Sequence, residues 1–221
     1  VRQREMPHVA HRARDREAER VFPPRQAARL VVDVYVAAAI VEVLEDLFDD
    51  DLSFQVDVAK RGRRKKVAQD VETARHLQRS VKLFVGPPNS GKTHAAFERL
   101  AQAHDGAYLA PLRLLALEGR DRLVARGVPC SLLTGEENVP AEHARVVSST
   151  IEMVGTERPI DVAVIDEAQM IFDGSRGWAW TQAIVAVPAS EVIVICSAYA
   201  VPAIENLLGL CGERCTVRHF E

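Results

Sequence analysis

Short apolar runs alternate with longer helix-forming stretches from residue 81 to the end of the chain. The runs predicted as strands are 82–85, 107–110, 130–134, 144–148, 162–165 and 191–196. The stretches predicted as helices lie near 92–102, 112–126, 178–187 and 201–208, and 215–221 is either a last strand or the start of a linker. Strands and helices that alternate in this way form a mainly parallel sheet flanked by helices, which predicts an α/β domain over 81–221.

The first 80 residues show a different pattern. Residues 1–20 are polar and charged, whereas 25–48 have apolar positions at helical spacing without proline or glycine, which predicts a long helix. Alternating positions in 52–58 fit a short strand or an irregular segment. The basic run 60–66, KRGRRKK, is either a solvated linker or a phosphate contact, and it leads into a second helix with Val67, Val71 and Ala74 on one face. We therefore expect a small, mostly helical N-terminal segment over 1–80.

Composition limits the classes of protein that fit. With 221 residues, 48% hydrophobic content and a net charge of -3, the chain can bury a core, but nucleic-acid binding would need local basic patches. The most apolar run, Leu30 to Val41, is about half of the roughly 20 residues that span a bilayer, so no membrane association is expected. Because the chain begins with Val1 and ends abruptly, we expect a fragment of a longer protein.

Cysteine and histidine spacing gives little support for a structural or catalytic zinc. Cys130, Cys196, Cys211 and Cys215 contain no C-x-x-C pair, and the histidines form no HExxH, so reduced thiols are expected. Any metal should arrive with a nucleotide. The alanine- and arginine-rich composition suggests a bacterial source and hence the cytoplasm, with the mitochondrial matrix as the alternative. The first twenty residues are rich in arginine, but they also contain acidic residues, which argues against a mitochondrial transit peptide.

A glycine-rich segment follows the first predicted strand of this domain and precedes its first predicted helix. It fits G-x-x-x-x-G-K-[ST] and consists of Gly86, Pro87, Pro88, Asn89, Ser90, Gly91, Lys92 and Thr93. The glycines let successive N–H groups point inward, and the helix adds its positive end, which predicts a nucleotide phosphate cradle. Lys92 would neutralise the β- and γ-phosphates, and the Thr93 hydroxyl would hold Mg²⁺.

A second motif is an apolar strand that ends in two carboxylates, VAVIDEAQ over 162–169. Such a strand would bring Asp166 to the Mg²⁺ shell, and the adjacent Glu167 would polarise the water that attacks the γ-phosphate. An acidic pair at a strand end is weak evidence alone. Together with the phosphate cradle, it predicts a site for Mg²⁺ and ATP.

The blocks between these motifs resemble a known family. They are APLRLLALE over 110–118, GVPCSLLTGEE over 127–137, STIEM over 149–153, VAVIDEAQM over 162–170 and RGWAW over 176–180. With GPPNSGKT, they are similar to the DExH-type, superfamily 2 RNA helicases of the mitochondrial RNA degradosome and their bacterial relatives. The resemblance covers nearly all of 81–187, and it implies the first RecA-like P-loop NTPase domain of an ATP-dependent RNA helicase, an ATP hydrolase.

The resemblance also implies roles for single residues. Those implied to line the RNA backbone track are Pro111, Arg113, Thr134, Gly135, Thr150 and Glu152. Gln169, the fourth residue of the DExH-type box, would link the γ-phosphate state to a neighbouring domain. Ser197 and Ala198 resemble the start of a coupling motif, from which Tyr199 departs.

Three other residues have plain structural interpretations. Trp178 and Trp180 could stack on bases, but two tryptophans at this spacing more often pack into a core or an interface. His94, just after the phosphate cradle, is expected on a helix surface.

Two alternatives to the helicase remain. A thymidine-kinase-like enzyme would use a similar P-loop with Glu167 as base on a nucleoside hydroxyl, although its zinc-binding C-x-x-C set is absent here. A nucleotide-sensing module without turnover is the other. The helicase family needs a second RecA-like domain that supplies arginines, so we expect this domain and RNA as partners, and an exoribonuclease as a further one.

Overall fold

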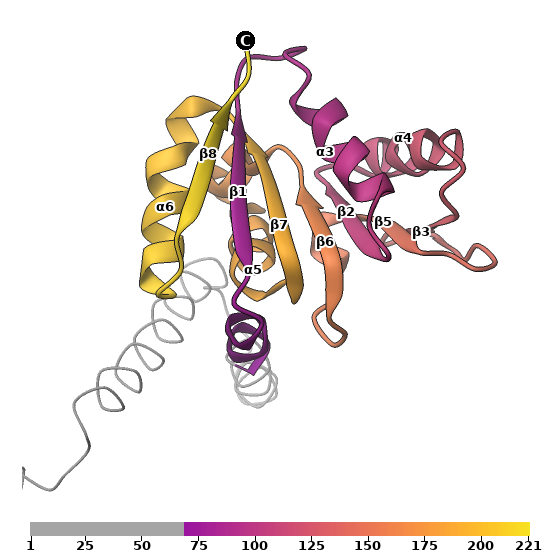
Figure 1. Ribbon diagram of the computed structural model, residues 1–221, viewed down its shortest axis with the longest axis horizontal. Helices are drawn as coiled ribbons and strands as arrows, with labels where there is room; N and C mark the ends of the chain where they lie inside the picture. Colours follow the sequence, from indigo (N-terminus) through magenta and orange to yellow (C-terminus); the bar gives the residue numbers. More distant parts are fainter. Residues whose placement is uncertain (1–68) are drawn as a thin grey trace, which may run out of the picture.

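The computed structural model describes residues 69–221, which form one twisted sheet with helices on both faces (Figure 1). A helix over 69–76 precedes the sheet. The strands are β1 (Ser80–Val85), β2 (Gly106–Ala110), β3 (Cys130–Leu133), β4 (Asn138–Val139), β5 (Val146–Thr150), β6 (Ile160–Ile165), β7 (Ala189–Cys196) and β8 (Cys215–His219). The α-helices are α3 (Lys92–Ala101), α4 (Arg113–Val124), α5 (Gly177–Ala186) and α6 (Val201–Leu210). Short 3₁₀ helices are η1 (Ile151–Met153), η2 (Ala168–Phe172) and η3 (Ala198–Ala200).

The strand order is β4-β3-β5-β2-β6-β7-β1-β8, and every neighbouring pair is parallel except β3 with β4. The carboxyl ends of β1, β2, β5, β6 and β7 therefore meet at the same edge of the sheet, where ligands bind in open α/β sheets. The terminal stretch is a strand, because β8 pairs with β1 over Val81–Val85 and Cys215–His219. The predicted α/β class is confirmed.

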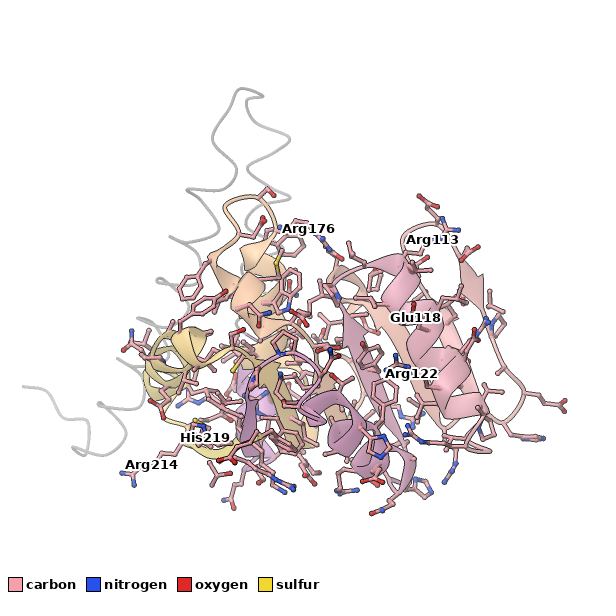
Figure 2. The ribbon with its side chains drawn as sticks, turned by 90° about the horizontal axis from the view of Figure 1, so that it is seen from above. Arg113, Glu118, Arg122, Arg176, Arg214 and His219 are labelled. Carbon is pink, nitrogen blue, oxygen red and sulfur yellow. The ribbon has the colours of Figure 1, made fainter. Side chains whose placement is uncertain are left out.

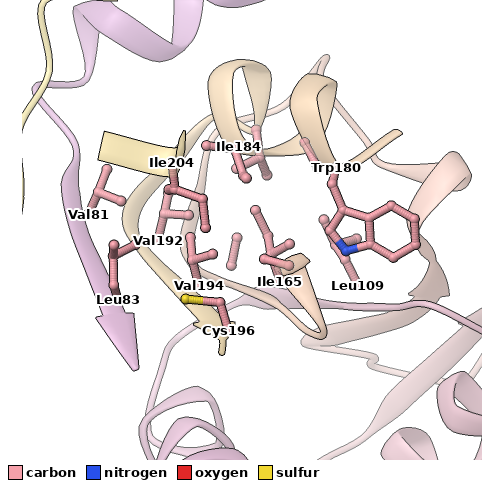
Figure 3. Packing of buried hydrophobic residues seen from close by; sticks show 14 of the residues in the cluster. Val81, Leu83, Leu109, Ile165, Trp180, Ile184, Val192, Val194, Cys196 and Ile204 are labelled. Carbon is pink, nitrogen blue, oxygen red and sulfur yellow. The ribbon is translucent and has the colours of Figure 1, made fainter. Parts of the chain in front are cut away.

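The central strands are buried on both faces because successive side chains point to opposite sides. In β1, Leu83 packs into the core beneath α5 and α6, whereas its neighbour Phe84 packs beneath α3. Figure 3 shows the first of these cores, in which Trp180, Ile184 and Ile204 lie over the side chains of the central strands. Burial on both faces explains why these strands have nearly continuous apolar sequences.

Each strand and helix predicted in 81–221 is present, with ends shifted by a few residues. The strand expected at 144–148 begins at Val146, and Thr134 lies just outside β3. Strand β4 was not predicted because its two residues are exposed and have no apolar pattern. The 3₁₀ helices are too short for a periodic signal.

The expected helix at 25–48, the segment 52–58 and the basic run 60–66 lie outside the described residues. Within the described range, Val71 and Ala74 lie in a helix, as expected, and both are buried, with Val71 packed against Val185, Ala186 and Cys211. Arg79 pairs with Glu213 and donates to the Val187 carbonyl at 2.9 Å. The division of the chain at residue 80 stays a prediction. No helix within 69–221 combines the length and apolar content needed to cross a bilayer.

Candidate nucleotide-binding site

The predicted phosphate cradle joins the end of β1 to the start of α3. Gly91, the residue before α3, has a φ of 87°, which glycine adopts without steric cost. A Cβ added at Gly86 would lie 2.4 Å from the carbonyl oxygen of Phe220, the residue after β8. Both motif glycines are thus required by the path of the backbone.

Two polar groups of the cradle fit a phosphate ligand. The Lys92 Nζ donates to the carbonyl oxygens of Gly86 and Pro87, each at 2.6 Å, so the ammonium lies against its own loop. The Ser90 hydroxyl is buried and has no hydrogen-bond partner among residues 69–221. Buried polar groups are normally paired, so an unpaired hydroxyl next to a loop lysine fits a site that a polyphosphate completes.

The two carboxylates follow β6 directly, and their environments differ. Asp166 is 5% exposed, and its carboxylate accepts hydrogen bonds from the Tyr108 hydroxyl at 2.7 Å and the Glu167 amide at 2.9 Å. Burial is the main reason that the pKa of Asp166 is raised. A buried carboxylate with a raised pKa suits a cation ligand, because a bound cation would offset the cost of its charge.

Glu167 is exposed and has a left-handed backbone, with a φ of 50° and a ψ of 44°. This conformation costs energy for a residue other than glycine, and such strain gathers at functional sites. Desolvation, followed by the negative charge of Asp166, raises the pKa of Glu167. Its carboxyl group is therefore a better proton acceptor than an ordinary glutamate.

These groups line the same cavity, which has a volume of about 440 Å³. Its walls include the loop from Pro88 through Lys92 and Thr93, and both Asp166 and Glu167. Residues of β2 and α4 also line the cavity, namely Tyr108, Glu118, Gly119 and Arg122. Figure 2 shows Glu118 and Arg122 on α4. No local sequence motif marks these residues as part of a nucleotide site.

Gln169 connects the carboxylates to the end of β7. Its amide nitrogen donates to the Glu167 carboxylate, and its side-chain oxygen accepts from the Ser197 amide at 3.2 Å. The stretch that resembles a coupling motif therefore contacts the candidate site through Ser197. Tyr199, where the motif departs from the family pattern, is 66% exposed and stacks on Phe172 instead.

The six residues expected to face RNA lie after β2, after β3, and at the end of β5 or in η1 directly after it, at the same edge of the sheet as the cavity. Pro111 and Glu152 both accept hydrogen bonds from Arg176. Thr134 is buried, and its hydroxyl accepts from the amides of Glu136 and Glu137, which shapes the loop that contains Gly135. Thr150 is 9% exposed, so its side chain offers little surface.

Arg113 is the exposed cation of this group and lies at the first position of α4. Its guanidinium pairs with the carboxylates of Glu136 and Glu137, which follow Gly135. Both partners are on the surface, so these ion pairs contribute little to stability.

The tryptophan and histidine interpretations can be compared with the structure. Trp180 is fully buried, which confirms core packing, and its indole N–H donates to the Asp166 carbonyl at 2.9 Å. Trp178 is partly buried against the same core. The His94 side chain is 64% exposed and lies near Glu98, which confirms a helix-surface position, although it also lines the cavity.

The cysteines are free thiols. Burial raises the pKa of Cys130, Cys196 and Cys211 to about 11. Thiolates are the reactive form, so these three buried groups are poor nucleophiles at neutral pH.

Gly119→Ala should destabilise the fold because Gly119 leaves room for Tyr108. An added Cβ would lie 2.5 Å from two ring carbons of Tyr108, which is held by Phe97 on one side and Asp166 at its hydroxyl. Such overpacking costs about 1–3 kcal/mol. Urea unfolding measures the loss, and Gly155→Ala, which has nothing within 4 Å of the new Cβ, is the matched control. Equal stability of the two variants would contradict the tight packing at Tyr108.

Comparison with known proteins adds to this geometry. A family model described as the DEXQ-box helicase domain of Suv3 matches residues 68–220. The mitochondrial ATP-dependent RNA helicase SUPV3L1 of Danio rerio is 44% identical over 155 residues, which cover 67% of this chain and 20% of that protein. The mitochondrial DExH-box ATP-dependent RNA helicase DExH18 of Arabidopsis thaliana is 36% identical over 202 residues, covering 91% of this chain and 25% of that protein.

A fungal relative matches with similar identity and coverage. The mitochondrial ATP-dependent RNA helicase SUV3 of Saccharomyces cerevisiae is 35% identical over 187 residues, covering 82% of this chain and 25% of that protein. This chain thus spans a fifth to a quarter of the length of the relatives it matches.

Proposed function

The chain belongs to the family of the DEXQ-box helicase domain of Suv3, and from this premise we propose that it is the ATP-binding domain of an ATP-dependent RNA helicase. The observation that carries the proposal is the convergence of Lys92, Asp166 and Glu167 on one cavity. The proposed activity is ATP hydrolysis coupled to movement on RNA or to its unwinding. The family match gives no support to the thymidine-kinase-like alternative.

Each residue at the cavity has a proposed part in hydrolysis. Lys92 would leave the carbonyls of its own loop and bind the β- and γ-phosphates, while loop amides at the start of α3 hold the phosphate chain. Thr93 and Asp166 are proposed to hold Mg²⁺, which when bound supplies Lewis-acid stabilisation of phosphate charge. The Glu167 carboxylate takes the proton of the attacking water, and its raised pKa favours this transfer. Gln169 orients Glu167 and transmits its position to Ser197.

RNA is proposed to lie along the loops after β2, β3 and β5. Arg113 would give up its ion pairs with Glu136 and Glu137 and pair with a phosphate of the RNA. The neighbouring loop around Gly135 would approach the RNA backbone closely. Contacts of this kind follow the sugar-phosphate chain and not the base sequence.

The relatives suggest the setting of the whole protein. Each relative is four to five times longer than its segment that matches this chain. We therefore propose that a second RecA-like domain in the longer protein completes the ATP site. Their names support a mitochondrial location, and they give no support to the bacterial cytoplasm that composition suggested. RNA degradation with an exoribonuclease partner stays a prediction.

Lys92→Ala should weaken binding of Mg-ADP by about ten- to a hundredfold, because one charge-assisted contact is worth about 1.5–3 kcal/mol. Isothermal calorimetry on the folded variant measures the change. Lys82→Ala is the matched control, since it removes a lysine that pairs with Glu191 away from the cavity. Unchanged affinity in the Lys92 variant would rule out the cradle as the nucleotide site.

Turnover assays separate the remaining functions. RNA-stimulated ATP hydrolysis by the full-length protein is the result expected of a helicase. Nucleotide binding without hydrolysis, with or without RNA, would instead indicate a sensing module, and phosphorylation of thymidine would indicate the kinase.

A further inference from the structure

Arg176 is the residue directly before α5, and its guanidinium contacts two segments that are distant in the sequence and one side chain of α5 itself. Its Nε and Nη2 donate to one carboxylate oxygen of Glu152 at 2.9 and 2.7 Å. Its Nη2 also donates to the Pro111 carbonyl at 2.6 Å. The guanidinium carbon lies 5.5 Å from the centre of the Trp180 ring, a cation–π distance. In Figure 2, Arg176 and Arg113 lie along the same margin of the molecule.

The Trp180 contact extends this set to the nucleotide site. Trp180 is fully buried, and its indole N–H donates to the backbone carbonyl of Asp166. Asp166 is the buried carboxylate of the cavity. One unbroken series of contacts therefore runs from Pro111 and Glu152 through Arg176 and Trp180 to the end of β6.

Glu152 would be unfavourable on an RNA-facing surface without Arg176, because a carboxylate repels phosphate. The Arg176 guanidinium offsets this charge by pairing with the Glu152 carboxylate, and the two side chains are 34% and 30% exposed. The hydrogen bonds of this pair are made to each other and to the Pro111 carbonyl. This arrangement favours a positioning role for the pair over direct contact with a strand.

We propose that Arg176 is a positioning residue that couples the RNA-facing loops after β2 and β5 to the carboxylates after β6. This inference rests on the proposed helicase function. Arg176 fixes the positions of Pro111 and Glu152 relative to Trp180. A displacement of either loop by RNA is therefore transmitted through Trp180 to Asp166. The role needs a guanidinium, because its planar fork contacts a carboxylate, a carbonyl and an aromatic face together, whereas a lysine ammonium is a single point charge.

The test uses the full-length protein with Arg176→Gln and Arg176→Lys. Both substitutions should lower the stimulation of ATP hydrolysis by RNA about tenfold, within the range of mutations that alter coupling. Both should leave Mg-ADP affinity and the salt dependence of RNA binding unchanged. Amide hydrogen exchange should become faster at 151–153 and 177–180 in both variants, which measures the loss of positioning without reference to activity.

Arg158→Gln is the matched control, because it removes an arginine–carboxylate pair, with Asp105, at the opposite end of β6. This control should change neither the stimulation of ATP hydrolysis by RNA nor the amide hydrogen exchange at 151–153. Arg176→Lys could preserve the stimulation of ATP hydrolysis by RNA, while Arg176→Gln lowered by about one the slope of log RNA affinity against log salt concentration. Arg176 would then be a direct phosphate contact, and the inference would be overturned. Normal exchange and stimulation in both variants would overturn it as well. An unsubstituted protein that RNA does not stimulate would contradict the proposed function itself.

Discussion

Glu167→Gln in the full-length protein should reduce ATP hydrolysis by about 10²–10⁴-fold while nucleotide still binds. The amide has the shape of the carboxylate but cannot accept the proton of the attacking water. It also removes a negative charge beside Asp166, so binding of an anionic nucleotide should not suffer. Steady-state hydrolysis and calorimetry with Mg-ATP measure the two effects separately.

The pH dependence gives a second check on Glu167. Only the ionised carboxylate can act as base, and its raised pKa means that ionisation occurs at a higher pH than for an ordinary glutamic acid. As the pH is lowered, the rate of hydrolysis should therefore begin to fall at a higher pH than the ionisation of an ordinary glutamate would give. The residual hydrolysis of the Glu167→Gln variant should not show this fall. Glu118→Gln makes the same chemical change at another residue that lines the cavity and should have a much smaller effect. Undiminished turnover in the Glu167→Gln variant would exclude Glu167 as the base.

The 221-residue chain by itself should bind Mg-ADP but hydrolyse ATP about 10³–10⁵ times more slowly than the full-length protein. The described domain has Lys92, Thr93, Asp166 and Glu167 at the cavity. By analogy with other phosphoryl-transfer sites, a missing arginine from an opposing domain costs about 4–7 kcal/mol of barrier. Arg122 also lines the cavity from α4, where its guanidinium lies 3.7 Å from the Glu118 carboxylate in an exposed ion pair.

Unwinding by the isolated chain should be undetectable. Strand separation needs two domains that close and open on the strand, and one domain has nothing to close against. The assay compares the chain with the full-length protein for RNA-stimulated hydrolysis and for separation of a duplex with an overhang. Fast unwinding by the short monomer would refute the two-domain mechanism, and fast hydrolysis alone would point to Arg122 as an arginine supplied by the same domain.

Local information was sufficient for the elements and for half of the candidate site. Strands such as β6 and β7 were predictable because burial on both faces requires nearly continuous apolar sequence. The cradle was predictable because Gly86, Gly91 and Lys92 act within one turn between a strand and a helix. Trp180 was expected in a core or an interface and lies in the core, since a large apolar side chain in an apolar helix gains most by burial.

The other half of the site depends on strand order. Parallel β2 lies between β5 and β6, so Tyr108 reaches Asp166, and α4 lines the cavity through Glu118 and Arg122. Strand β7 beside β6 brings Ser197 to Gln169. The sequence by itself determined which segments form most of the strands and helices and the glycine-rich loop between β1 and α3, because periodicity and turn chemistry act over a few residues. Only the tertiary structure decided which distant side chains meet, including Arg176 with Pro111 and Glu152, because pairing across a sheet leaves no mark in local sequence.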